Sequence, residues 1–221
     1  MLTFFTILIM LVVAYAQFRE GIFTAFTMLV NVLLAGLIAF NFWEPICNLL
    51  DSSMRDSFID GYQDMFVLIF LFCLSLGLLR TATNNLANKQ IAFPAVLQQF
   101  GAAGVGMLTG YLVSGFLICV LQTLPWHQNF IDFEPRNREE GGMRPYLPPD
   151  RVWLALMHYA GANGFARSAD NENAESAFDR YPTFDRNGSF ELRYWRYRRY
   201  SDKEGPMPYQ GELDQELKGI P

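Results

Sequence analysis

The sequence predicts an all-α membrane protein with four transmembrane helices and a short interfacial helix, plus a small extramembrane C-terminal α/β tail. Four long apolar runs occupy most of residues 1–126, and each is long enough to cross a hydrocarbon core of about 30 Å as a helix. The composition changes after residue 126, where eight of the eleven prolines and most of the arginines lie. These observations divide the chain into a membrane domain, residues 1–126, and a polar remainder.

The first apolar run predicts a transmembrane helix over residues 2–18. Ala14-Tyr15-Ala16 has the form of a signal-peptidase site, but no basic residue precedes the apolar region and Arg19 follows it, which is the wrong polarity for a secretory signal. Arg19 and Gly21 frame a tight turn into the second helix, residues 22–43. A connection this short predicts that the first two helices are antiparallel neighbours.

The second helix carries a stripe of small and polar side chains. Its members, at spacings of three and four, are Thr24, Thr27, Asn31 and Ala35. In one interpretation Asn31 forms interhelical hydrogen bonds, each worth roughly 0.6 to 2 kcal/mol. In the other, Asn31, Thr24, Thr27 and Ser75 line a small channel or transporter. Because Asn31 has no ionisable companion, the sequence favours interhelical hydrogen bonding.

The third helix is expected over residues 62–80, after an acidic connection. Within that connection, residues 44–61, apolar side chains at near-helical spacing predict a short helix lying in the membrane interface. Cys73 and Gly77 lie four apart in the third helix and offer a small face for helix packing. Asp64, near the start of this helix, is interpreted as an interfacial acid that the helix dipole favours.

The fourth helix, residues 95–124, is the predicted packing centre of the bundle. It has no charged residue from Gln98 to Leu124. Small residues recur every four positions along one side of it: Ala102, Gly106, Gly110 and Ser114. In lipid, such a ridge associates helices because it lets their backbones approach closely. We therefore expect the ridge to pack neighbouring helices, and a homo-oligomer could form through it.

The connections between the helices predict an orientation in the membrane. Arg19, Arg80 and Lys89 lie in the first and third connections, whereas the middle connection is acidic. The positive-inside rule places the basic connections in the cytoplasm. The N-terminus and the C-terminal tail are therefore expected to be extracytoplasmic.

The remaining chain is expected to form a linker, a small extramembrane segment (151–200) and a disordered tail. Residues 127–150 are rich in proline and glycine, and residues 201–221 are polar. Between them, a helical pattern starts at Asp150-Arg151 and stops at Gly161, with an apolar face that packs either on the tail itself or on the membrane surface. A β-prone run of aromatic and arginine residues follows. An extracytoplasmic tail would meet lipid headgroups and no nucleic acid.

The sequence contains no recognisable catalytic, metal or cofactor constellation. His127 and His158 are isolated from any second ligand at metal-binding spacing. Asp185-x-Asn187-Gly188 lacks the glycine position and the closing glutamate of a calcium loop. No phosphate-binding loop, GxSxG motif or paired intramembrane carboxylates occur. We therefore expect a protein that is not an enzyme and that needs no cofactor.

Two stretches resemble the CvpA family, the bacterial colicin V production proteins. FREGIFTAFTMLV, Phe18–Val30, is similar to the family's Arg/Gly turn into its second helix. FGAAGVGMLTGYLVSGFLICVLQTLP, Phe100–Pro125, is similar to its glycine-rich last helix. The resemblance covers residues 1–125, and the third connection is poorer in basic residues than the family pattern.

The resemblance implies a multi-pass protein of the bacterial inner membrane with a role in colicin V production or export, a toxin-biosynthesis function, and in envelope homeostasis. Since no catalytic set is present, we expect a non-enzymatic scaffold or anchor that sits in the lipid bilayer. Its tail would contact an envelope protein partner. The alternative is a small channel or transporter subunit with the polar lining described above.

Overall fold

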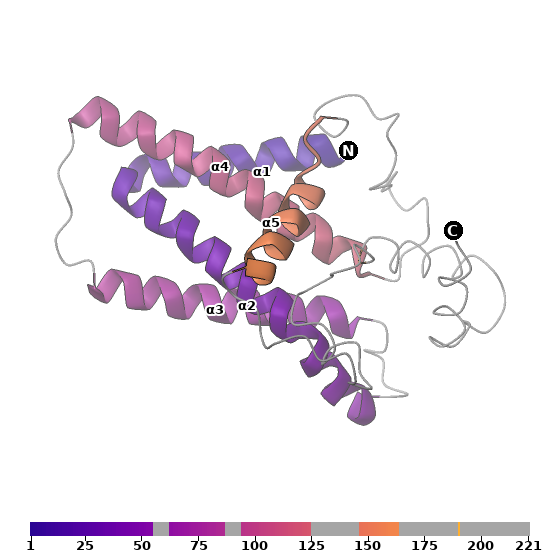
Figure 1. Cartoon of the computed structure of the whole chain (residues 1–221). Helices are drawn as coiled ribbons and strands as arrows, with labels where there is room; N and C mark the ends of the chain where they lie inside the picture. Colours follow the sequence, from indigo (N-terminus) through magenta and orange to yellow (C-terminus); the bar gives the residue numbers. More distant parts are fainter. Residues whose placement is uncertain (55–61, 87–93, 125–145, 164–189, 191–221) are drawn as a thin grey trace.

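The computed structural model of the protein describes residues 1–54, 62–86, 94–124, 146–163 and 190 (Figure 1). Within them lie the helices α1 (Leu2–Glu20), α2 (Ile22–Met54), α3 (Gln63–Leu86), α4 (Ala95–Gln122) and α5 (Pro149–Asn163). The first four contain apolar stretches long enough to cross a membrane, which confirms the predicted all-α fold with four candidate spans. The predicted β-prone run and the disordered tail lie outside the described residues, apart from Phe190.

The four candidate spans pack in an order that differs from their order in the sequence. α1 packs mainly on α4, α4 on α2, and α2 on α3. α1 and α2 join at Gly21 but have limited contact and diverge from their turn (Figure 1). This differs from the predicted antiparallel pair, because the small-residue ridge of α4 accepts α1 instead. α4 and α2 therefore form the centre of the molecule.

α2 continues as one helix through the segment that was expected to form a separate interfacial helix. Residues 44–54 belong to α2, which contains Pro45, so the expectation of an independent helix there is wrong; residues 55–61 lie outside the described part. Proline removes one intrahelical hydrogen bond and favours a kink. The helix nevertheless continues because Ile46, Cys47 and Leu50 pack against the core of the bundle.

α3 extends beyond its predicted end at Arg80 to Leu86. Two threonine hydroxyls in the added stretch donate to backbone carbonyls one turn earlier: Thr81 to Gly77 at 2.8 Å and Thr83 to Leu79 at 2.6 Å. These hydrogen bonds satisfy polar side chains within the helix. The change to polar sequence after Arg80 therefore did not mark the end of the helix.

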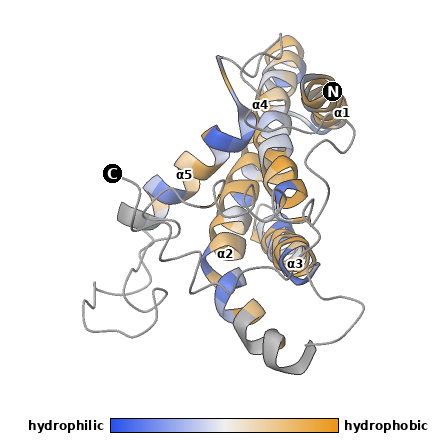
Figure 2. Cartoon of the chain, turned by 90° about the vertical axis from the view of Figure 1, so that its right-hand side faces the viewer, coloured by the Kyte–Doolittle hydropathy of each residue, from blue (hydrophilic) through white to orange (hydrophobic). Residues whose placement is uncertain are grey.

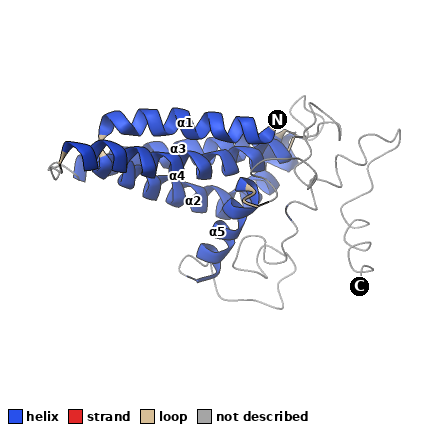
Figure 3. Ribbon diagram, turned by 90° about the horizontal axis from the view of Figure 1, so that it is seen from above, coloured by secondary structure: helices blue, strands red, loops and turns tan. Residues whose placement is uncertain are grey.

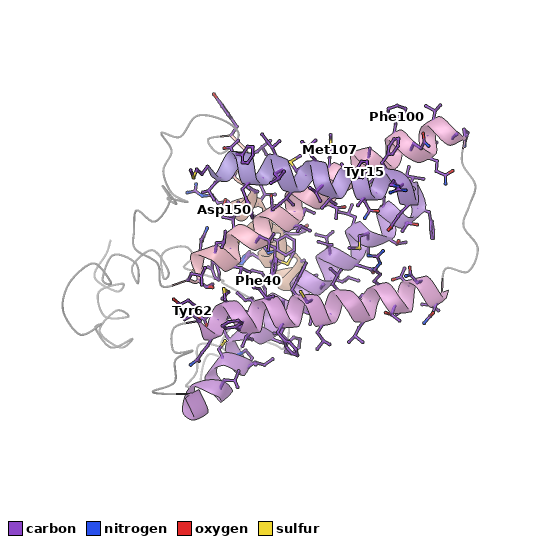
Figure 4. The ribbon with its side chains drawn as sticks, turned by 180° about the vertical axis from the view of Figure 1, so that it is seen from behind. Tyr15, Phe40, Tyr62, Phe100, Met107 and Asp150 are labelled. Carbon is purple, nitrogen blue, oxygen red and sulfur yellow. The ribbon has the colours of Figure 1, made fainter. Side chains whose placement is uncertain are left out.

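The core is a cluster of aromatic rings contributed by several helices. Phe72 of α3 stacks on Phe116 of α4 with ring centroids 4.0 Å apart. Phe40 of α2 lies edge-on to Phe116 at 6.1 Å and to Trp153 of α5 at 6.2 Å. In Figure 4, Phe40 lies among the helices, whereas Phe100 and Met107 lie along the outer side of α4. The core thus joins α5 to the candidate spans.

Candidate functional site

α4 presents two packing faces, and the first is the glycine face toward α1. A Cβ added to Gly106 would lie 2.8 Å from the Cα of Ala14, and one added to Gly110 would lie 2.7 Å from the Cα of Met10. Both neighbours are backbone atoms, so a larger side chain would force the two helices apart. Ala102 is fully buried on the same side.

The ridge predicted from the four-residue spacing is thus filled by α1 of the same chain. Its last member, Ser114, is fully buried, and its hydroxyl donates to the carbonyl of Tyr111 at 2.7 Å. A hydroxyl that bonds to its own helix can be buried without an unsatisfied donor. Within one chain, Gly106 and Gly110 of this ridge are therefore already in contact with α1.

The second face of α4 holds the chain that enters α5. The Tyr111 hydroxyl donates to the carbonyl of Leu147 at 3.2 Å. The Gln122 amide donates through Nε2 to Oδ2 of Asp150 at 2.9 Å, and the Cys119 thiol donates to the Asp150 carbonyl with an Sγ–O distance of 3.7 Å. These donors lie at spacings of eight and three along α4, so they project from one side of the helix. We refer to Tyr111, Gly115, Cys119 and Gln122 as the α5-docking face.

Asp150 is the charged side chain most deeply enclosed at this face, with an exposed fraction of 0 %. It occupies the first turn of α5, where the helix dipole favours a negative charge. Together with the hydrogen bond from Gln122, this position offsets the cost of burying a carboxyl group.

Two glycines make room for α5 between α4 and α2. A side chain at Gly115 would collide with the carbonyl oxygen of Pro149 and lie 2.9 Å from its carbonyl carbon. A side chain at Gly36 would collide with the ring of Trp153 and lie 3.2 Å from the sulfur of Met157. Trp153 is fully buried, and its indole N–H makes no hydrogen bond within the described part of the chain. Close packing, rather than hydrogen bonding, therefore holds this ring.

The tail also contacts this core at Phe190, which is 3 % exposed. Its ring lies 5.9 Å from that of Phe40 and 6.2 Å from that of Trp43. Segment 151–200, expected to be extramembrane, therefore contributes Trp153, Met157 and Phe190 to the core of the bundle. This finding differs from the expectation that the helix after Asp150 packs on the tail or on the membrane surface.

The polar residues of the α2 stripe have different hydrogen-bond partners. Asn31 is 5 % exposed, and its Oδ1 lies 3.2 Å from the Thr83 hydroxyl of α3, whose one proton it shares with the carbonyl of Leu79. The Thr27 hydroxyl donates instead to the carbonyl of Thr24 in its own helix at 2.9 Å. Ser75 is buried on α3. The described structure therefore uses Asn31 to link α2 to α3, as the interhelical interpretation expected.

The turn predicted between the first two helices adopts a conformation that favours glycine. Gly21 has a φ of 97°, and its N–H donates to the carbonyl of Gln17 at 3.1 Å. Arg19 is exposed in the last turn of α1. The next residue, Glu20, forms an exposed ion pair with Arg80 of α3 at 3.3 Å. The first and third connections therefore begin at the same end of the bundle, as the four-span arrangement requires.

The small face predicted on α3 is not packed within the described chain. Cys73 is exposed, and a Cβ added to Gly77 would meet no atom within 4 Å. The spacing of Cys73 and Gly77 resembles that of the α4 ridge, yet these residues face outward. Spacing alone therefore did not distinguish a packed small face from an open one.

The comparisons with known proteins identify the membrane domain. A family model described as Colicin V production protein matches residues 2–135. The chain belongs to this family. No curated protein and no solved structure matches the chain. As a Colicin V production protein family member, it is a membrane protein with four candidate spans.

The α5 helix lies beyond the part of the chain that matches the Colicin V production protein family. The match ends at residue 135, whereas α5 starts at Pro149 and packs on α4 and α2. Among the described residues, no group of three His, Cys, Asp or Glu side chains gathers in a way that could hold a metal ion. The arrangement described is therefore a helix-docking site, built from the family domain and completed by a helix outside the match.

Sequence reasoning missed most residues of the docking site. Gly36 of α2 has no small residue four positions later, so its spacing did not predict a packing face. On α4, Gly115, Cys119 and Gln122 do lie on one side of the helix. That second stripe could have been found by examining both sides of the fourth helix. Nothing in the spacing identified Trp153 as its partner, because that contact joins residues far apart in the chain.

Proposed function

We propose that this protein is a non-enzymatic scaffold of the bacterial inner membrane that holds its C-terminal segment on the extracytoplasmic side for an envelope protein partner. The observation that carries the proposal is the docking of α5: Trp153 inserts among Phe40, Phe72 and Phe116 of three candidate spans. A segment that has only to be tethered needs no buried docking site of this kind. Docking of α5 fixes the point at which the following chain leaves the membrane domain.

The extracytoplasmic placement rests on the charges of the connections. Arg19 and Arg80 lie toward the end of the bundle where α1 and α3 finish, and Glu20, the neighbour of Arg19, forms an ion pair with Arg80. The N-terminus and the start of α5 lie toward the opposite end (Figure 1). Positive residues favour the cytoplasmic side, so this arrangement supports a tail outside the cytoplasm. A reporter fused at Pro221 should be active in the periplasm, and cytoplasmic activity would overturn the orientation.

The family name, Colicin V production protein, supports a role in colicin V production, and we extend the proposal to its export and to envelope maintenance. We expect a host strain that lacks its own family member to recover colicin V release when it receives this chain. The Trp153→Ala variant should reach the membrane at a normal level but should not restore colicin V release, because α5 then lacks the buried ring that holds it on the bundle. Leu156→Ala, on the exposed side of the same helix, is the matched control and should retain it.

The scaffold and the channel alternative predict different results in purified vesicles. The scaffold should give no flux of ions or small solutes in liposomes, and Trp153→Ala should not change that. Flux that requires Asn31 would support the polar lining instead. Full colicin V release by Trp153→Ala would remove the central support for the scaffold.

A further inference from the structure

α5 crosses the candidate spans instead of running parallel to them (Figures 1 and 3). Its first turn lies along the last two turns of α4, where Pro149 packs against Gly115 and Asp150 accepts a hydrogen bond from Gln122. Two turns later, the sulfur of Met157 lies against Gly36 of α2. The nearest charged residue of α2 is Glu44, and Gly36 lies about 12 Å before it at 1.5 Å per residue. α5 therefore starts beside the C-terminal part of α4 and reaches the middle part of α2.

The exposed side of α5 is apolar at this depth. Leu156 is 37 % exposed and Tyr159 is 71 % exposed. Ala155, next to Leu156, is also exposed. The charged residues, Asp150 and Arg151, lie in the first turn, beside the end of α4. Figure 2 shows this hydrophilic first turn next to α4. The helix thus carries its charged residues in the first turn, and the residues further along are apolar apart from the half-buried His158, the hydroxyl of Tyr159 and the terminal Asn163.

The neighbouring spans expose apolar side chains at the same level. Ile38, two residues from Gly36 in α2, is 37 % exposed, and Phe70, two residues from Phe72 in α3, is 64 % exposed. If α5 lay in water, these side chains would lie in water as well. Spans of this length and composition place such residues in the hydrocarbon region.

We propose that α5 is embedded in one leaflet of the bilayer, at the end where α4 finishes, with Leu156 and Tyr159 in contact with lipid acyl chains. Apart from the carbonyls of its last turn, its backbone hydrogen bonds are made within the helix, so most of its backbone can occupy this position without exposing unsatisfied groups to lipid. Arg151 remains near the headgroups. Since α5 lies on the side of α2 and α4 away from α1 and α3 (Figure 2), the protein is wider in this leaflet than in the other.

Cysteine accessibility in lipid nanodiscs, which leave both faces open to reagent, tests this proposal on the full chain. Cys73 is exposed and is replaced by alanine, whereas Cys47 and Cys119 are buried and stay. The probe sites are Leu156→Cys and Tyr159→Cys. Leu11→Cys, on the outer side of α1, is the lipid-facing reference, and Arg19→Cys, in the polar turn, is the aqueous reference.

We expect both probe cysteines to react with a membrane-impermeant maleimide about tenfold or more slowly than Arg19→Cys, as Leu11→Cys does, because apolar surroundings disfavour the reactive thiolate. A small fluorophore attached at either probe site after solubilisation should be quenched in the reconstituted protein by lipids that carry a spin label on the acyl chain. Reaction as fast as that of Arg19→Cys would overturn the proposal by placing α5 in water. Slow reaction without lipid quenching would also overturn it, because protein would then cover this side of α5.

Discussion

The two faces of α4 hold their partner helices by different means. Toward α1, Gly106 and Gly110 bring backbone against backbone, with Cβ positions only 2.8 and 2.7 Å from the Cα atoms of the neighbouring helix. Toward α5, Gln122 donates to the carboxyl group of Asp150, and Trp153 fills the space beside Gly115. The first face depends on the absence of side chains, and the second depends on particular side chains.

This difference follows from the partners. α1 is apolar along nearly its whole length, and in lipid its association gains little from burying apolar side chains, so close van der Waals contact decides where it binds. α5 begins with the charged residues Asp150 and Arg151 and lies across the bundle. A buried carboxyl group requires a hydrogen-bond donor, and Gln122 supplies one. The α5-docking face is therefore specific for one partner, whereas the glycine face accepts a helix whose surface lets the two backbones come into contact.

The largest expected effect comes from filling the glycine face. Gly106→Leu combined with Gly110→Leu should lower the free energy of unfolding by about 4 kcal/mol, since each forced overpacking typically costs about 1–3 kcal/mol and both side chains meet backbone. Steric trapping in bicelles measures this loss. Gly104→Leu is the matched control on the same helix, because a Cβ there meets no atom within 4 Å.

The same experiment distinguishes the small face of α4 from that of α3. Gly77→Leu should change the free energy of unfolding by less than about 0.5 kcal/mol, as exposed substitutions usually do. If Gly77→Leu proves as damaging as the Gly106 and Gly110 pair, then α3 is packed against a surface outside the described residues. If the pair proves as harmless as Gly104→Leu, backbone contact does not hold α1.

A smaller effect is expected at the α5-docking face. Trp153→Ala removes a fully buried ring and should weaken the docking of α5 by about 3 kcal/mol, at the low end for a large-to-small core substitution. Amide hydrogen exchange of α5 reports this as faster exchange of its backbone, while α1 and α4 keep their protection. Leu156→Ala should leave the exchange of α5 unchanged. Equal exchange in Trp153→Ala and the unmodified protein would show that the ring does not hold the helix.

The contrast between the faces also explains what the sequence could predict. Four apolar runs and the period-four ridge of α4 depend on local composition and helical spacing, so the spans and the packing of α4 could be predicted from residues near one another in the chain. The same rule selected Cys73 and Gly77, because spacing does not report which way a helix is turned. The docking of α5 depends on contacts such as Gln122–Asp150 and Gly36–Trp153, which only the folded chain brings together.

The smallest effect lies between α2 and α3, away from both faces of α4. The hydrogen bond from Thr83 to Asn31 is 3.2 Å long, and such interhelical bonds average about 0.6 kcal/mol in membrane proteins. A double-mutant cycle of Asn31→Leu and Thr83→Val should therefore give a coupling energy of about 0.6 kcal/mol. Thr27→Val is the matched control and should show no coupling to Asn31, since the Thr27 hydroxyl donates to the Thr24 carbonyl, whereas the Thr83 hydroxyl shares its proton between Leu79 and Asn31. No coupling between Asn31 and Thr83 would mean that the amide serves another purpose, and solute flux lost in Asn31→Leu would identify that purpose as conduction.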